Sequence, residues 1–265
     1  MPVQQLFYKT VVPVSADRHG DVSIRTGADY SFARETNAAP VTAAEFLAAS
    51  AEYPIVFAGE GERIFPSVIL GGRDAQNIHV DAEGRWTGRH VPAFVRRYPF
   101  VFSVDEAGER FTLNVDEEAP AFNRDGRGER LFDADGEQTR YLKSVLEFLQ
   151  RYQMHFVRTQ AFCQRLVEHD LLQSVQAQFD GPEGARSTLG GFMAVNREKL
   201  KALPDEVVTQ MFRRDELECL YLHLASLTHF RGMAEKMGGA APAQETDPAA
   251  SADPDSPADP VEAVG

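Results

Sequence analysis

The chain has 265 residues, of which 43% are hydrophobic, and a net charge of −13. A chain of this length can bury a full hydrophobic core in one large domain or two small ones. Its excess of acidic residues argues against nucleic acids and anionic membrane surfaces as partners, because both require clustered Lys and Arg. No apolar run approaches the roughly 18 residues of a membrane-spanning helix, and the N-terminal stretch lacks the charged and apolar regions of a secretory signal. We therefore expect a soluble, cytoplasmic protein without membrane insertion.

Residues 1–137 favour β-strands and contain one short predicted helix. Thr42 is followed three residues later by Glu45, which is the spacing of a capping box and predicts a helix that ends near Ala51. Short apolar runs bounded by Gly and Pro predict two buried strands, at 53–59 and 64–72. Three further segments place an Asp three residues before a Gly, a pattern typical of turns, at 80–86, 104–111 and 132–139.

The hydrophobic period changes after Gln138. Apolar residues then recur at steps of three and four, which predicts one long helix from about Thr139 to His169. A period-two pattern around glycines predicts a hairpin over 175–196, and Asn196 is expected to cap the helix that follows. The last helix is expected to bury an apolar face formed by Leu217, Leu220, Tyr221, Leu224 and Leu227.

The order of these elements predicts an α+β fold, because strands come first and helices follow instead of alternating with them. We expect a strand-rich N-terminal half, with a mixed or antiparallel sheet, packed against a helical C-terminal half. Residues 1–237 would form this single domain. Residues 238–265 contain no Lys or Arg, six acidic residues and five prolines, so we predict a disordered acidic tail that is either solvated or a partner-binding arm.

Four segments, in this order, resemble the SapC family of bacterial proteins: "YPIVF" at 53–57, "VPAFVRRYPFVF" at 91–102, "LFDADGEQT" at 131–139 and "LYLHLASL" at 220–227. The resemblance covers the body of the chain and omits the tail. It implies an accessory or binding protein linked to surface-layer, uptake or modification systems. The resemblance carries over no catalytic residue and no cofactor.

The segment at 91–102 is predicted to be a strand, and it contains two adjacent arginines, Arg96 and Arg97. Neighbouring strand residues point to opposite faces, so only one arginine can face inward. We expect Arg96 to be that residue because it shares a face with Phe94, Tyr98 and Phe100. The inward arginine either packs on aromatic rings and pairs with a carboxylate or with loop carbonyls, or holds a ligand. In the ligand-binding interpretation Arg96, Arg97, Tyr98 and Trp86 bind a small anionic ligand or a partner protein.

A second interpretation makes the chain a metal-dependent enzyme. His79 and Asp81 have the His-x-Asp spacing that opens the facial triad of non-haem iron enzymes. That triad requires a second histidine, and the candidates His155, His169, His223 and His229 all lie on predicted helices. Asp81 also fits a turn. We therefore prefer a binding protein that needs no metal or cofactor, and keep the iron enzyme as the alternative.

The composition of the tail leads to the first testable prediction. Deletion of residues 238–265 should leave the melting temperature unchanged, because the segment has no apolar face that could pack on the body. A thermal melt of the full chain and of the truncated chain measures this. A decrease of several degrees would show that the tail stabilises the folded domain.

Overall fold

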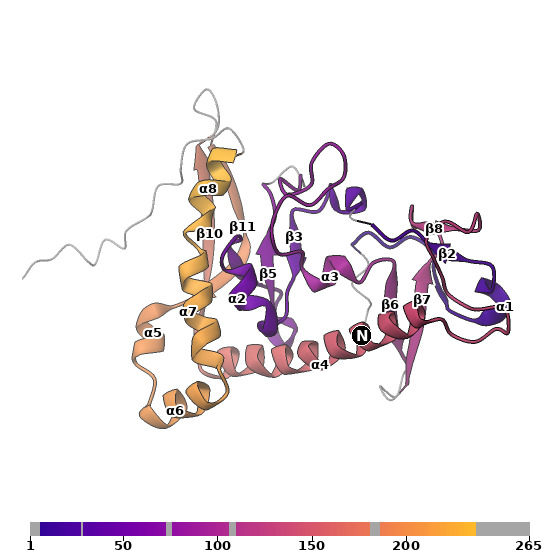
Figure 1. Ribbon diagram of the computed structural model, residues 1–265. Coiled ribbons are helices and arrows are strands. Elements are labelled where there is room, and N and C mark those ends of the chain that lie inside the picture. The colour runs from indigo at the N-terminus through magenta and orange to yellow at the C-terminus, as the bar shows by residue number, and fades with distance from the viewer. Residues whose placement is uncertain (1–5, 28, 73–75, 106–109, 181–185, 237–265) are drawn as a thin grey trace, which may run out of the picture.

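The computed structural model describes residues 6–27, 29–72, 76–105, 110–180 and 186–236, which form an α+β fold with two sheet regions (Figure 1). Every strand pair among these residues is antiparallel. The long helix α4 (Arg140–Glu168) runs beneath both regions. The predicted fold class is therefore confirmed, whereas the predicted tail lies outside the described residues.

The larger sheet has the strand order β10-β11-β4-β5-β3. The two apolar runs predicted as buried strands form its neighbouring strands β4 and β5, and the predicted hairpin forms β10 and β11. One face of the sheet packs into the main hydrophobic core through fully buried side chains of Ile55, Phe57 and Val68. Its strands are β3 (Ala38–Pro40), β4 (Ile55–Ala58), β5 (Phe65–Ile69), β10 (Leu172–Asp180) and β11 (Arg186–Val195).

The predicted capping box is present at the start of the helix that precedes β4. Thr42 and Glu45 satisfy each other's backbone groups, and the helix begins with a 3-10 turn, η2 (Ala43–Glu45), before α2 (Phe46–Ala49). Ser50 follows as the C-terminal cap, close to the predicted end. Phe46 is fully buried against the main core, so the helix is fixed at both its polar start and its apolar face.

The second region consists of two small sheets with the strand orders β1-β7-β6 and β8-β2-β9. They enclose a separate hydrophobic cluster whose buried members include Ile24, Phe100, Val115 and Leu131. Three short helical segments also belong to the strand-rich half: α1 (Ala16–His19), η1 (Ser31–Ala33) and η3 (Gly61–Arg63). The strands of the second region are β1 (Val11–Pro13), β2 (Ser23–Ile24), β6 (Phe100–Val104), β7 (Phe111–Asp116), β8 (Phe122–Asn123) and β9 (Glu129–Arg130).

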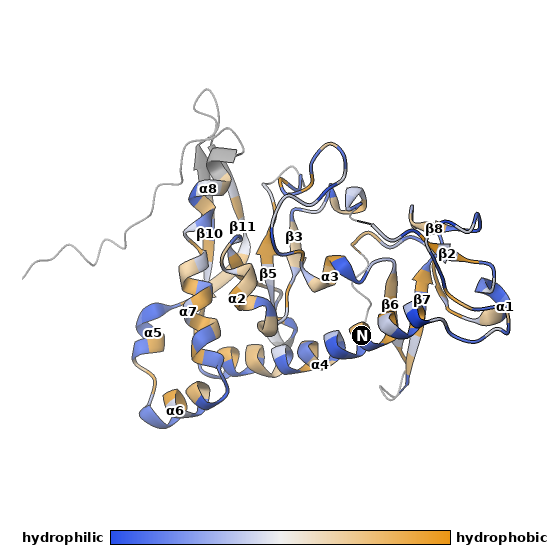
Figure 2. Cartoon of the chain, in the orientation of Figure 1, coloured by the Kyte–Doolittle hydropathy of each residue, from blue (hydrophilic) through white to orange (hydrophobic). Residues whose placement is uncertain are grey.

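The long helix α4 joins the two hydrophobic clusters. The Thr139 hydroxyl caps its N-terminus by accepting a hydrogen bond from Leu142 N. Its 29 residues span about 44 Å at 1.5 Å per residue. Leu142 and Leu149 are buried in the second region, whereas Phe162 and Leu166 are buried in the main core. Figure 2 shows hydrophobic and hydrophilic residues alternating along this helix, as expected for one that is only half covered.

The C-terminal helices are α5 (Arg197–Lys201), α6 (Asp205–Arg213), α7 (Glu216–Ser226) and α8 (His229–Lys236). Asn196 caps α5 as predicted, by accepting from Lys199 N. No helix in the described part of the chain has the length and hydropathy needed to cross a bilayer.

The apolar face predicted for α7 is wrong at Tyr221, which is 55% exposed. The buried positions are Glu216, Leu220, His223 and Ser226. Three of these four are polar: the Glu216 carboxylate pairs with Arg165 of α4, whereas His223 and Ser226 lie where α7 packs against strand ends that offer backbone hydrogen bonds. His223 Nε2 accepts from Val195 N, and the His223 Nδ1–H and the Ser226 hydroxyl bind Ile55 O and Ile55 N.

The strand predicted at 91–102 is wrong in its first half. Residues Ala93–Arg96 form one turn of helix, α3, after which the chain passes through a cis peptide between Tyr98 and Pro99 and enters β6. Arg96 N and Arg97 N donate to Pro92 O and Ala93 O, so the backbone is satisfied locally. Successive residues of a helix differ by about 100° in direction, and the argument that assigned the two arginines to opposite faces of a strand therefore fails.

Two of the three predicted Asp–Gly turns are confirmed. The bridges Val80–Trp86 and Phe132–Gln138 close them, and Gly84 and Gly136 have positive φ angles of 82° and 79°. A positive φ is costly for any residue with a Cβ, which explains the glycine at each position. Part of the third predicted turn, residues 106–109, lies outside the described residues.

The buried His223 predicts how stability depends on pH. Burial lowers its pKa from 6.5 to about 4, so the unfolded chain binds a proton there between pH 6.5 and pH 4 and the folded chain does not. The contribution of neutral His223 to the free energy of unfolding should therefore be fully present above pH 6.5. It should decrease by roughly 3 kcal/mol as the pH is lowered to 4. Urea denaturation at pH 7.5, 6.0 and 5.0 measures this.

The variant His223→Gln is the control for this pH dependence. It should be less stable at pH 7.5, because both hydrogen bonds to the strands are perturbed, and its stability should change less between pH 7.5 and 5.0. An equal pH slope in the variant and the wild type would contradict the assignment.

Candidate functional site

The arginine-containing segment is positioned by a buried carboxylate, that of Glu45. This residue is 8% exposed. One oxygen accepts from Thr42 N at 2.9 Å, and the other from Ala93 N at 2.7 Å and His90 Nε2 at 3.1 Å. Burial alone would raise the pKa of Glu45, but the hydrogen bonds from His90, Thr42 and Ala93 outweigh it and hold the pKa below its usual value. Glu45 therefore stays ionised and fixes the start of α3.

Arg96 is exposed and lies over α4. Its guanidinium carbon is 5.3 Å from the centroid of the Phe148 ring, and its Nε donates to Val91 O at 3.0 Å. Burial raises the pKa of Tyr30, and the positive charge of Arg96 offsets part of this increase. Arg96 therefore presents a charged group to solvent, and its field reaches Tyr30.

Arg97 is the half-buried member of the pair, contrary to the expectation that Arg96 faces inward. Its guanidinium carbon lies 4.1 Å from the ring centroid of Phe94, 5.2 Å from that of Tyr152 and 5.8 Å from that of Tyr8. Its Nε atom is buried and has no hydrogen-bond partner in the segments that the structure describes. A guanidinium tolerates such surroundings because its planar, weakly hydrated cation stacks on aromatic faces.

Neither arginine has a carboxylate partner within the described residues. In contrast, Arg18 and Arg165 each bind one carboxylate through two nitrogen atoms, of Glu117 and Glu216 respectively. The positive charges of Arg96 and Arg97 are stabilised by rings and by one carbonyl. They are consequently available to an anion from outside the chain.

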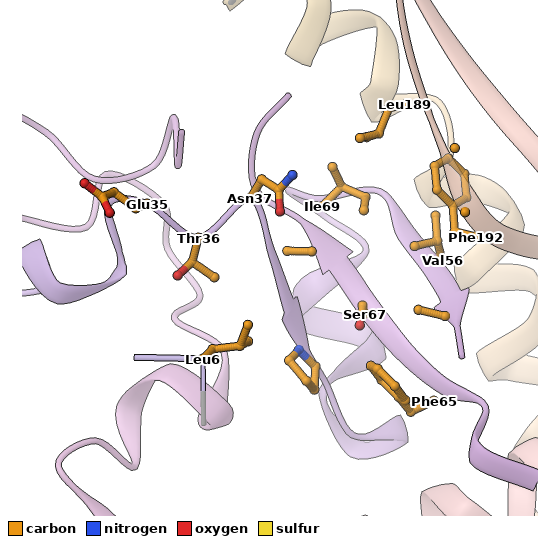
Figure 3. Close-up of a pocket in the computed structure, with 15 residues that line it drawn as sticks. Leu6, Glu35, Thr36, Asn37, Val56, Phe65, Ser67, Ile69, Leu189 and Phe192 are labelled. Carbon is orange, nitrogen blue, oxygen red and sulfur yellow. The ribbon is translucent and has the colours of Figure 1, made fainter. Parts of the chain in front are cut away.

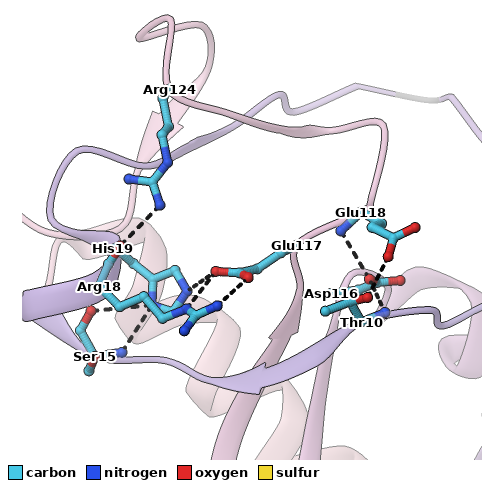
Figure 4. A network of polar contacts seen from close by, with 8 residues as sticks. All are labelled: Thr10, Ser15, Arg18, His19, Asp116, Glu117, Glu118 and Arg124. Atoms are coloured by element: carbon cyan, nitrogen blue, oxygen red, sulfur yellow. Dashed lines mark hydrogen bonds and ion pairs between the residues drawn. The ribbon is translucent and has the colours of Figure 1, made fainter.

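Tyr98 connects this segment to the N-terminal residues. Its hydroxyl donates to Asp116 at 3.3 Å, and Asp116, which is fully buried, also accepts from Lys9 N and Thr10 N at 2.9 Å each. Burial, together with the Asp116 charge, raises the pKa of Tyr98. Asp116 is followed by two further acidic residues, Glu117 and Glu118 (Figure 4). The Glu117 carboxylate binds Arg18 and approaches His19. Tyr98 is therefore a hydrogen-bond donor at ordinary pH, and its position is fixed.

A series of aromatic rings leads from Tyr98 to Trp86. The ring centroids of Tyr98 and Phe32 are 4.2 Å apart, those of Phe32 and Tyr30 are 6.2 Å apart, and those of Tyr30 and Trp86 are 5.7 Å apart. All four residues are half-buried, so each ring has one protected and one accessible part. We call Tyr30, Phe32, Trp86, Arg96, Arg97 and Tyr98 the arginine–aromatic site.

Hydrogen bonds hold Trp86 in place. Its Nε1 donates to the Tyr53 hydroxyl at 3.0 Å, and that hydroxyl donates to His90 O at 2.5 Å. A side chain at Gly88 would collide with the Tyr53 hydroxyl and the Glu52 carboxylate, so this close approach requires a glycine. Because His90 also binds Glu45, Trp86 and α3 are held by one hydrogen-bond network.

His79 and Asp81 lie in different surroundings. His79 is 6% exposed, with its ring 4.8 Å from that of Tyr53 and 6.2 Å from that of Trp86. The Asp81 carboxylate accepts from Glu83 N, Arg85 N and Arg85 Nε, and the bond from Arg85 N is the main cause of its lowered pKa. Among the described residues no three His, Cys, Asp or Glu side chains form a metal-binding group. The iron site stays a prediction.

Of the predicted site residues, Arg96, Arg97 and Tyr98 are consecutive in the chain, and Trp86 is linked to Tyr98 only through the rings of Phe32 and Tyr30. His79 lies beside Trp86, whereas Asp81 faces its own turn. Sequence reasoning missed Tyr30 and Phe32, and it missed the rings of Phe148 and Tyr152 under the arginines. The spacing of four residues between Phe148 and Tyr152 places both on one face of the predicted long helix. This spacing was the available signal, but it does not identify the residues that pack on that face.

Comparisons with known proteins agree with the sequence resemblance. A model of the family described as SapC matches residues 14–233. No significant match was found among curated proteins or among solved structures. The matched range contains most of the chain and every residue of the arginine–aromatic site.

The two arginines should respond differently to substitution by lysine. We expect Arg97→Lys to lower the free energy of unfolding by about 1–2 kcal/mol, because a compact ammonium is more strongly hydrated and stacks less well on three rings. Arg96→Lys should change it by no more than about 0.5 kcal/mol, because Arg96 is exposed. Urea denaturation of both variants measures this. Equal effects would contradict the assigned orientations.

Proposed function

The chain belongs to the SapC family, and we propose that it is a binding protein whose ligand occupies the arginine–aromatic site. The ligand in this proposal is a small anion with a flat apolar body. The observation that carries the proposal is the presence of two adjacent guanidiniums, without carboxylate partners in the described part of the chain, beside a series of aromatic residues that are only half-buried.

The charges support an anionic ligand. Arg96 is exposed, and its planar guanidinium can bind a carboxylate or phosphate through two parallel hydrogen bonds. Arg97 adds a second positive charge that is only half-buried and is not neutralised by a neighbouring carboxylate. In a partly water-excluded position such a charge acts more strongly than it would in bulk water.

The rings support a flat apolar body. Tyr30 packs on Trp86 with the ring centroids 5.7 Å apart, and the positive charge of Arg96 acts on Tyr30. In this proposal an anion bound by Arg96 extends its apolar body toward these two rings. Aromatic side chains give contact area at a small entropic cost, since few torsions have to be fixed. The network from Glu45 through His90 and Tyr53 holds the surface in shape before a ligand arrives, which reduces the cost of binding.

The wider role belongs to the same proposal. A protein that binds a small anion can serve a surface-layer, uptake or modification system as an accessory component, which is the role that the family resemblance implies. We place this role in the bacterial cytoplasm, on the basis of the sequence features described above.

The single tryptophan makes the proposal testable, because Trp86 lies within the site. Phenylacetate should change the Trp86 fluorescence in a saturable manner, and phenylacetamide, which has nearly the same shape without the charge, should bind at least ten-fold more weakly. In Arg96→Gln the affinity for phenylacetate should decrease roughly 10- to 100-fold, because a hydrogen bond between charged groups is lost.

Arg89→Gln is the matched control, since Arg89 is also exposed and lies outside the site. This variant should bind phenylacetate as the wild type does. Equal affinities for the acid and the amide, or an Arg96→Gln variant that binds phenylacetate normally, would refute the proposed site.

A further inference from the structure

A cavity of about 330 Å³ lies on the outer face of the five-stranded sheet, opposite the main core (Figure 3). Successive strand residues point to opposite faces. Because Ile55, Phe57 and Val68 enter the main core, the alternate residues Val56 and Ser67 face the cavity. The strand register places Ser67 directly between Pro40 and Val56, so this serine lies at the centre of the cavity floor.

Helix α8 covers only part of this outer face. Phe230 and Met233 of α8 form a hydrophobic cluster with Val56, Ile69 and Phe192. Val56, Ile69 and Phe192 also line the cavity. The cavity therefore adjoins the part of the sheet that α8 covers. Its apolar walls are continuous with a packed cluster, which gives the cavity a fixed shape.

Two largely buried residues, Ser67 and Thr36, bring hydroxyl groups to the cavity, and neither hydroxyl has a hydrogen-bond partner among the described residues. Ser67 is 4% exposed and Thr36 is 8% exposed. Figure 3 shows Ser67 on the floor and Thr36 at the side next to Leu6. Both hydroxyls open into the cavity, where water or a bound molecule can hydrogen-bond to them. They therefore offer a ligand two polar contacts on a largely apolar surface.

The lining also determines the charge of that molecule. Among the described residues that line the cavity, Glu35 has the one charged side chain, and none is Lys, Arg or His. An anion would be repelled by Glu35 and would find no counter-ion on the apolar floor, whereas a neutral or cationic molecule meets neither obstacle.

We propose that this cavity is a second binding site, which takes a small apolar molecule bearing one hydroxyl or amino group and no negative charge. The polar group hydrogen-bonds to Ser67 at the centre of the floor, and the apolar body lies on Val56, Ile69 and Phe192. The volume is at the small end of the range for ligand pockets, which limits the site to small molecules. This site has a different lining from the arginine–aromatic site, which prefers the opposite charge.

The test uses three molecules of nearly equal shape: hexan-1-ol, hexylamine and hexanoate. Saturation-transfer NMR titrations of the full chain at pH 7 should show that the alcohol and the amine bind, and that hexanoate binds to this cavity at least ten-fold more weakly. The hexanoate titration is carried out on Arg96→Gln, so that the arginine–aromatic site does not contribute. Glu35→Gln should weaken the binding of hexylamine but leave that of hexan-1-ol unchanged.

Two substitutions of Ser67 locate the binding. Ser67→Ala should weaken hexan-1-ol binding roughly two- to ten-fold by removing one hydrogen bond, and its melting temperature should match that of the wild type, because the hydroxyl had no partner to lose. Ser67→Val fills the floor and should abolish binding, whereas Ser174→Ala, at an exposed serine of β10, should have no effect. If no probe binds, if hexanoate binds as well as hexan-1-ol, or if Ser67→Ala binds hexan-1-ol with wild-type affinity, the proposal is overturned.

Discussion

The arrangement of the arginine–aromatic site depends on the burial of one carboxylate, that of Glu45. A buried carboxylate is stable only if its oxygens are fully hydrogen-bonded. Glu45 obtains its donors from its own capping box and from residues 90 and 93, far along the sequence. The start of η2 is in turn tied to the long helix, because Ala43 N donates to the Thr159 hydroxyl. The short helix, the arginine segment and α4 are therefore held in one relative position.

The same physical solution recurs in other parts of the fold, since single polar side chains satisfy the backbone of distant segments. His223 and Ser226 of α7 satisfy both backbone groups of Ile55 at the start of β4. Asp116, at the end of β7, accepts from two backbone amides of the N-terminal segment. Each of these side chains would lose hydration without compensation if its segment moved away. Polar groups thus determine how the elements are placed, and hydrophobic burial supplies most of the stabilisation.

Signals that act within a few residues predicted the structure well. The capping box at Thr42, the cap at Asn196 and the long helix that starts near Thr139 depend on local spacing, and all are present. The prediction of a strand over the whole of 91–102 was wrong because the composition of this segment is strand-like, whereas its conformation is set by Glu45 and by the rings of α4. Arg96, Arg97, Tyr98 and Trp86 could be selected from the sequence by residue type, and their binding of a ligand stays a prediction. Trp86 is linked to Tyr98 through the rings of Tyr30 and Phe32, which the sequence did not single out. The half-buried position of Arg97 was not predictable, because two of the rings around it come from distant segments, Tyr8 from the N-terminal segment and Tyr152 from α4.

The two proposed sites share a wall, formed by consecutive residues. Leu6 lines the sheet cavity, and the ring of Phe7 packs against Phe32 and Tyr98 of the arginine–aromatic site at 5.0 Å and 5.4 Å. A displacement of this wall by a ligand in one site would change the shape of the other, and thermodynamic linkage makes such an effect reciprocal. The charges keep the two sites selective, because Glu35 stands at one and the unpaired arginines at the other. A shared wall with opposite charges on its two sides allows two different ligands to bind close together without competing for the same position.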